Sequence, residues 1–118
     1  MLSSDHRLHR SADFTEVVRR GRRASRPLLT VHCLLDPAHG DTPARAGLVV
    51  SKAVGGSVVR HRTARRLRHL IRDRVGALPA GSRVVVRASR TSGSATSTSL
   101  AADLDGALAS AVRERARP

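Results

Sequence analysis

The fold is decided by one stretch of sequence, residues 52–74, which reads KAVGGSVVRHRTARRLRHLIRDR. Eight of its residues are Lys or Arg, and its single acid is Asp73. Ser57 is a good helix N-cap, and Gly76 and Pro79 are typical of a helix end. The stretch therefore predicts a helix from residue 58 to about residue 75.

The predicted helix has two unlike faces. At about 100° per residue, one arc of roughly 160° collects the apolar positions, which are Val59, Leu67, Leu70, Ile71 and Val75. The opposite arc is basic and holds His61, Arg62, Arg65, Arg66, Arg68, His69 and Arg72. One side is expected to pack on a sheet while the other forms a basic stripe. Two arginines, Arg60 and Arg74, fall on the apolar side.

The basic stripe is unlike an ordinary solvated helix face. Opposite charges four residues apart stabilise a helix and like charges repel, so solvated faces usually mix the two signs. Here Arg62 and Arg66 are like-charged neighbours, as are Arg68 and Arg72. A plain solvated face is the alternative, but the repulsion favours an external anion. The chain contains no Asn or Gln, the usual partners of adenine edges, so RNA fits better than sequence-specific DNA reading.

Composition supports the same interpretation. The chain has 118 residues, enough for one domain, and carries a formal net charge of +13. Compositional drift explains the choice of Arg over Lys equally well, but not the net charge, which points to a polyanionic partner. No apolar run approaches a membrane span and residues 1–10 lack an apolar signal segment, so we expect a cytoplasmic protein. The lone Cys33 cannot form an internal disulfide and is most simply a small core residue.

The remaining segments predict a small mixed fold within a single domain, residues 1–118. Residues 1–10 are expected to be a flexible lead-in, and residues 89–99 a mobile Ser/Thr/Gly loop. Helices are predicted at 11–20 and 100–115, and strands at 28–35, 45–51 and 83–88, with a turn or loop at 36–44. The first two strands are expected to pair as an antiparallel hairpin.

The order of residues resembles the protein subunit of bacterial ribonuclease P. Its signature is similar to RHRTARRLR at residues 60–68, where His61 and Ala64 depart from the family's Asn and Lys. The similarity extends upstream through RAGLVVSKAVGGSVV at residues 45–59 and RSADFTEVVRRG at residues 10–21, and downstream to VVV at residues 84–86. It covers essentially the whole chain.

The resemblance implies an α+β fold, a two-layer α/β sandwich with a four-stranded sheet, element order αβββαβα and a left-handed βαβ crossover. An additional short strand is then expected near residues 52–55. The resemblance also implies an enzyme subunit: the family's RNA carries the active site and its Mg²⁺ ions and removes the 5′ leader of precursor tRNA, while the protein assists. We expect no catalytic residue, no metal site and no cofactor on the protein alone.

The resemblance further implies two contact surfaces. The ribonuclease P RNA is expected on the basic helix, at Lys52, Arg60, His61, Arg62, Arg65, Arg66, Arg68 and Arg72. The 5′ leader of precursor tRNA is expected in a cleft formed by Phe14, Val18, His32 and Val49. The family often has aromatics at positions 18 and 32, so base stacking here rests on Phe14, for which a plain core role is an equal alternative.

Two other functions compete with this one. A structural RNA-binding protein, such as a ribosomal protein, would share the basic helix and the small fold. A protein-only nuclease is disfavoured because the sequence offers no convincing carboxylate cluster and no Cys/His ligand set.

Overall fold

The computed structural model describes the backbone of residues 4–35 and 40–116. The main elements are α1 (Ser11–Arg20), β1 (Arg22–Ser25), β2 (Leu29–Leu35), β3 (Arg45–Val49), α2 (Ser57–Val75), β4 (Ser82–Ala88) and α3 (Ser97–Ala116). Short 3₁₀ helices lie at η1 (Ser4–His6), η3 (Lys52–Val54) and η4 (Arg90–Ser94). The expected order αβββαβα is confirmed. The predicted loop at 36–44 falls partly outside the described residues.

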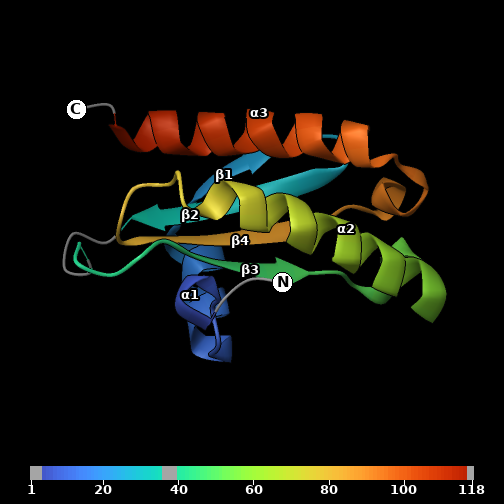
Figure 1. The fold of residues 1–118 in the computed structure, drawn as a ribbon, viewed down its shortest axis with the longest axis horizontal. Coiled ribbons are helices and arrows are strands. Elements are labelled where there is room, and N and C mark those ends of the chain that lie inside the picture. The colour runs from blue at the N-terminus through green and yellow to red at the C-terminus, as the bar shows by residue number, and fades with distance from the viewer. Residues whose placement is uncertain (1–3, 36–39, 117–118) are drawn as a thin grey trace.

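The four strands form one mixed sheet in the order β1-β2-β4-β3. β2 pairs antiparallel with both β1 and β4, whereas β3 pairs parallel with β4. In Figure 1, β3 and β4 both run to the right, α2 returns in front of the sheet, and β4 lies above β3. This arrangement is a left-handed βαβ crossover, the hand that the resemblance implies and that is rare among proteins.

Two strand predictions were wrong. The expected hairpin between residues 28–35 and 45–51 does not form, because β4 enters the sheet between β2 and β3. The additional strand is not near residues 52–55, which hold η3; it is β1, on the other edge of the sheet. β1 reads Arg-Arg-Ala-Ser and buries only Ala24, so it lacks the apolar alternation that marks a strand in sequence.

The main core lies between the sheet and the two long helices. α2 and α3 cover one face, which Figure 1 shows from the helix side. Leu67 and Ile71 of α2 meet Leu100 and Leu104 of α3 over sheet residues such as Val84. The predicted apolar faces of both helices are thus confirmed, and Cys33 lies in the same core, as expected. These buried leucines and valines fix α2 with its opposite side outward.

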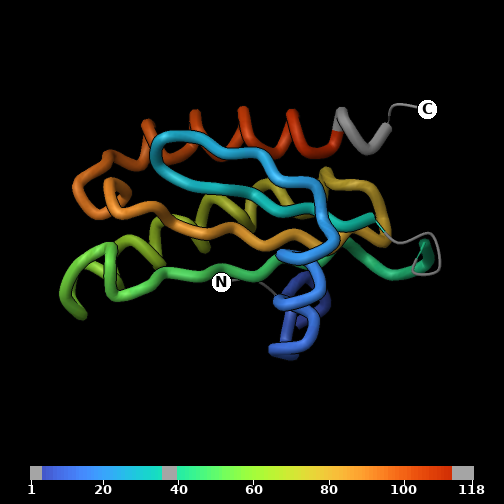
Figure 2. The backbone as a smooth tube through the Cα atoms, turned by 180° about the vertical axis from the view of Figure 1, so that it is seen from behind, coloured from blue at the N-terminus to red at the C-terminus, as the bar shows by residue number. Residues whose placement is uncertain are grey.

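The other face of the sheet carries α1, which lies behind the sheet in Figure 1 and in front of it in Figure 2. Val17 is fully buried there with Leu34 and Val85, and Phe14 and Val18 pack against them. α1 ends at Gly21, as predicted, where the Gly21 N–H donates to Val17 O at 2.8 Å. We call this side of the sheet the α1 face.

Two segments expected to be loose are attached to the fold. Leu8 is buried, and its N–H donates to Ala46 O at 3.0 Å, which covers the free edge of β3. Within residues 89–99, Ser92 and Gly93 are buried in η4. α3 begins at Ser97 rather than at residue 100, because the Thr96 hydroxyl accepts the Ser99 N–H at 3.1 Å and caps the helix. The η4 and Thr96 contacts involve Ser, Thr and Gly residues, which have no apolar pattern from which they could be predicted.

Candidate nucleic-acid interface

The outward side of α2 is an open basic surface. Five of its basic residues are exposed, namely His61, Arg65, Arg68, His69 and Arg72. All except Arg72 border one hollow of about 720 Å³. The one acid of the helix, Asp73, lies 3.7 Å from the Arg72 Nε. We call these five residues the arginine face; four of its five members have no acidic neighbour among the described ion pairs.

Two predicted RNA contacts are occupied inside the protein. Arg62 Nη2 donates to Gly93 O at 3.1 Å, and Arg66 Nη1 donates to Ala95 O at 3.0 Å. Both side chains are half-buried. They therefore tie α2 to the η4 segment at the margin of the arginine face. This role could not be predicted from the sequence, since the segment that supplies the carbonyls is Ser/Thr/Gly-rich.

The basic residues near the ends of α2 have different surroundings. Lys52 is exposed in η3, directly before the helix. Arg60 is half-buried, its Nε has no hydrogen-bond partner, and it borders a hollow with Leu48 and Arg68. Arg74, on the apolar side, forms an ion pair with Asp105 of α3 and donates to Leu70 O at 3.0 Å. This ion pair lowers the pKa of Asp105 and explains an arginine on the core side.

The four residues predicted for the leader cleft are brought to the α1 face. Phe14 and Val18 come from α1, and His32 alternates with the buried Leu34 along β2. Val49 alternates with Gly47 along β3 and is 37% exposed. Phe14 is half-buried, and its ring packs closely against Gly47. A Cβ atom added to Gly47 would overlap the Phe14 ring. Phe14 therefore has both a packed side and an open side, which joins the two roles considered for it.

His32 has no polar partner although it is almost fully buried. Its exposed fraction is 3%, and neither Nδ1 nor Nε2 makes a hydrogen bond. Burial, and then the positive charges of Arg87 and Arg23, lower the pKa of His32 below its ordinary value of 6.5. A buried polar group without a partner costs about 1–3 kcal/mol. The two exposed arginines beside His32 suit a ligand that brings negative charge.

Arg23 and Arg87 are the residues that sequence reasoning missed. Arg23 lies opposite His32 in the β1–β2 register, and Arg87 lies opposite Val49 in the β3–β4 register. Both are exposed. The signal was present in β4, where Arg83, Val85 and Arg87 alternate and must share one face. That face could not be assigned while the strand neighbours were unknown.

The arginine face and the α1 face meet at the edge formed by β3. Arg68 of α2 and Phe14 of α1 border one cavity of about 310 Å³, together with Gly47 and Leu48 of β3. The two predicted surfaces are therefore continuous around this edge. One extended ligand could touch both.

Among the described residues, no group of three or more His, Cys, Asp or Glu side chains is placed to hold a metal ion. Within the same part of the chain, no helix has the length and apolar character needed to cross a membrane.

The fold and these two surfaces define a class: a small, strongly basic α+β protein whose exposed cations suit a polyanion. Comparison with known proteins narrows this class. A family model described as Ribonuclease P matches residues 2–112. The ribonuclease P protein component of Streptomyces avermitilis is 59% identical over 114 residues, covering 92% of this chain and 93% of that protein. That of Thermobifida fusca is 50% identical, covering 98% and 82%. The chain belongs to the ribonuclease P protein family.

Solved structures share the fold. The ribonuclease P protein of Staphylococcus aureus superposes with a TM-score of 0.78 at 21% identity, covering 91% of this chain and 97% of that one. The corresponding protein of Thermotoga maritima gives a TM-score of 0.71 at 20% identity, covering 92% and 96%. The expected α+β fold is confirmed.

Proposed function

We propose that this chain acts as the protein subunit of ribonuclease P, assisting a catalytic RNA in removing the 5′ leader of precursor tRNA. The observation that carries the proposal is the arginine face of α2, where Arg65 and Arg68 are exposed and without acidic partners. Family membership selects this function over a structural ribosomal role, since the named relatives are ribonuclease P components.

The catalytic RNA is assigned to the arginine face. Arg65, Arg68 and Arg72 project from a rigid helix whose other side is held in the core, so their positions are fixed before RNA binds. A guanidinium group donates bidentate hydrogen bonds to phosphate oxygens, which suits the closely spaced phosphates of a folded RNA. Lys52 and Arg60 extend the surface at the start of the helix. Arg62 and Arg66 contribute positive potential while holding the η4 segment.

The leader is assigned to the α1 face. Arg23 and Arg87 are exposed and carry positive charge beside the buried His32. Phe14 and Val18 form an apolar wall on α1, and Val49 lies at the far edge on β3. A single strand needs a positive groove and a stacking surface. Because Phe14 is the one Phe, Tyr or Trp of the chain, we expect electrostatic attraction to contribute most of the affinity for the leader.

The chemistry of the reaction is assigned to the RNA. To the protein we assign the tasks of binding, orienting and neutralising charge, because exposed arginines are what its two surfaces offer. No step of the cleavage runs through a protein side chain. Because its RNA partners are cytoplasmic in a bacterium, the cytoplasm is the compartment we propose.

Reconstitution tests the proposal. Purified chain, bacterial ribonuclease P RNA and precursor tRNA are mixed at low Mg²⁺, and release of the 5′ leader is measured on a gel. We expect rapid cleavage with both components, little with RNA alone and none with the chain alone. Absence of stimulation by the chain would overturn the subunit role, and cleavage without RNA would overturn the assignment of the chemistry.

A further inference from the structure

The Ser/Thr/Gly-rich segment 89–99 has no part in the two surfaces assigned above. It holds eight hydroxyl residues, and the chain has no acid between Asp73 and Asp103. The segment forms η4, runs along the margin of α2 and leads into α3. Its hydroxyl groups therefore lie beside the most basic helix of the protein, with no carboxylate of their own segment among them.

Most of the hydroxyl groups in η4 and before α3 are used by the fold. Ser92 is buried and donates to a backbone carbonyl at 2.6 Å, and Thr91 donates to another at 2.9 Å. Thr96 caps α3. Ser94 differs, because it is exposed and its one described hydrogen bond is a long contact of 3.4 Å to Thr91 O. A modifying enzyme can reach this hydroxyl without breaking a short hydrogen bond.

Ser94 is further distinguished by two arginines of α2. Arg62 donates to Gly93 O and Arg66 donates to Ala95 O, the carbonyl groups of the residues directly before and after Ser94. Each of these bonds uses one of the five N–H groups of a guanidinium. The Arg62 Nε is buried and has no hydrogen-bond partner. Both arginines therefore keep donors close to the Ser94 side chain.

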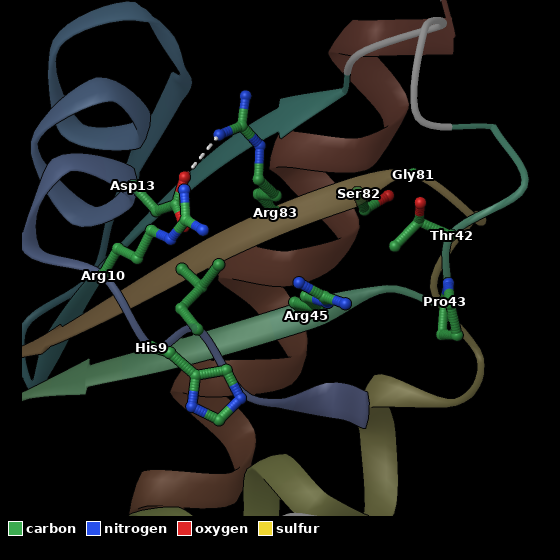
Figure 3. A pocket seen from close by; sticks show the side chains of 10 residues that line it. His9, Arg10, Asp13, Thr42, Pro43, Arg45, Gly81, Ser82 and Arg83 are labelled. Atoms are coloured by element: carbon green, nitrogen blue, oxygen red, sulfur yellow. Dashed lines mark hydrogen bonds and ion pairs between the residues drawn. The ribbon is translucent and has the colours of Figure 1, made fainter. Parts of the chain in front are cut away.

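These two arginines lack the acids that neutralise half-buried arginines elsewhere in the fold. Arg83 Nη1 lies 3.2 Å from Asp13 Oδ1, the ion pair drawn as a dashed line in Figure 3. Arg74 pairs in the same way with Asp105. The two arginines of α2 are half-buried too, but their described partners are neutral carbonyl groups. An anion at Ser94 would supply the missing partner.

We propose that Ser94 is a phosphorylation site, and that its phosphate pairs with Arg62 and Arg66 and weakens the binding of ribonuclease P RNA. The phosphoryl donor is ATP, bound by a protein serine/threonine kinase. The bond from the γ-phosphorus to the bridging oxygen of ADP breaks, a bond from that phosphorus to Ser94 Oγ forms, and the hydroxyl proton passes to the base of the kinase. Phosphoserine carries a charge of about −1.5 to −2 at pH 7 and three strong acceptor oxygens.

The phosphate acts on RNA binding through its charge. It neutralises the positive potential of Arg62 and Arg66 and repels the RNA phosphates that Arg65 attracts. The Debye length is about 8 Å at physiological salt, so the effect is strongest for a charge placed directly beside α2. This consequence rests on the proposed function, whereas the pairing of the phosphate with the two arginines does not.

The modification itself is sought in the whole chain isolated from its own cells, in growing and in stationary cultures. Trypsin cleaves after Arg90 and Arg113, so residues 91–113 are released as one peptide. Fragmentation in the mass spectrometer then locates a phosphate among its hydroxyl groups. We expect the phosphate on Ser94. An unmodified peptide from both cultures, or phosphate confined to other residues, would overturn the proposal.

The pairing with arginine is tested on the whole chain with phosphoserine encoded at position 94. The second pKa of phosphoserine is ordinarily about 6. In a ³¹P NMR titration we expect this pKa to be lower in the folded chain than in the same chain unfolded in urea, because neighbouring guanidinium groups favour the dianion. An equal pKa in the two states would show that Arg62 and Arg66 do not bind the phosphate.

The effect on RNA is measured as affinity for ribonuclease P RNA, with phosphoserine at the exposed Ser97 as a matched control of equal charge. We expect affinity about tenfold weaker with phosphate at Ser94 and changed by less than about threefold with phosphate at Ser97. Equal weakening by both would overturn the assigned role of Arg62 and Arg66, and no weakening would overturn the regulatory role.

Two further measurements separate the possible failures. If the unmodified chain does not bind the RNA, the proposed function fails, while the ³¹P titration still decides whether the phosphate pairs with arginine. If the chain with phosphate at Ser94 is unfolded by circular dichroism, Ser94→Glu is measured instead, with Ser97→Glu as its control. Weaker RNA binding by the first of these variants alone would support the proposal, and equal binding by both would overturn it.

Discussion

His32 shows how one residue links the fold to the ligand. It lies on β2, between two buried positions of the same strand, and is itself buried without a polar partner. Its neutral ring is the form that the fold tolerates, because Arg23 and Arg87 disfavour a third positive charge. Phosphate groups bound at Arg23 and Arg87 would reverse this balance, because their negative charge favours the protonated ring.

The titration of His32 is therefore expected to respond to RNA. Its pKa lies below 6.5 in the free protein, so between that value and 6.5 the unfolded chain binds a proton that the folded chain does not. The free energy of unfolding accordingly decreases as the pH falls through this window. NMR titration of the ring should show the pKa rising when a leader oligoribonucleotide is added, and also in Arg87→Ala. A pKa of 6.5 or above in the free chain, or one unmoved by RNA, would contradict the assignment.

Gly47 gives a second test at the scale of a residue. A Cβ at this position would overlap the Phe14 ring, so Gly47→Ala must displace α1 or the ring. Urea unfolding should show a loss of about 1–3 kcal/mol, as overpacking usually causes. Gly76→Ala is the control, because nothing lies within 4 Å of its new methyl group. Equal stability of the two variants would mean that Phe14 does not rest on Gly47.

At the scale of the element, α2 divides its arginines between two tasks. Arg62 and Arg66 are turned to the carbonyls of Gly93 and Ala95, whereas Arg65 and Arg68 are exposed. Residues one helical turn apart along the same face therefore differ in role. The η4 segment causes the difference, because it packs along one margin of the helix.

This division predicts that alanine substitutions of these arginines destabilise the fold to different extents. Arg62→Ala and Arg66→Ala should each lower the free energy of unfolding by about 1–3 kcal/mol, since a hydrogen bond from a charged group is lost. Arg65→Ala should change it by less than about 0.5 kcal/mol, as expected for an exposed side chain. Denaturant unfolding of the three variants measures both. Similar losses in all three would show that the clamp is absent.

Elements with strong apolar periodicity were predicted well, and elements without it were not. Leu67, Ile71, Leu100 and Leu104 specified both long helices and their buried sides. β1 was missed because Ala24 is its only buried residue. The parallel pairing of β3 was missed because its partner β4 does not begin until Ser82, after α2, and nothing in either strand indicates the register.

The residues of the candidate sites could likewise be predicted only where the periodicity of a helix or strand determines their position. The exposed members of the arginine face could be predicted, since helical spacing alone places them on one side. The half-buried Arg62 could not be separated from Arg65, because its partner is a backbone carbonyl 31 residues away. Arg23 and Arg87 became candidates only once the sheet order placed them beside His32.

For the whole molecule, the fold must hold together a chain whose net positive charge repels itself. A net charge of +13 on 118 residues opposes compaction, and the core between the sheet and the two long helices must offset it. Exposed arginines lie on both the arginine face and the α1 face, and these two surfaces meet at β3. Binding a polyanion along this continuous surface relieves the repulsion and gives the affinity its dependence on salt.

The most direct measurement is the salt dependence of binding to ribonuclease P RNA. The slope of log K against log [KCl] is compared for wild type, Arg65→Ala with Arg68→Ala, and the control Arg19→Ala, an exposed arginine of α1 on the opposite side of the sheet. Each lost phosphate contact lowers the slope by roughly one unit, so the double variant should lose about two units and bind more weakly, while the control stays at the wild-type slope. An unchanged slope in the double variant would contradict the claim that the arginine face of α2 is the RNA interface.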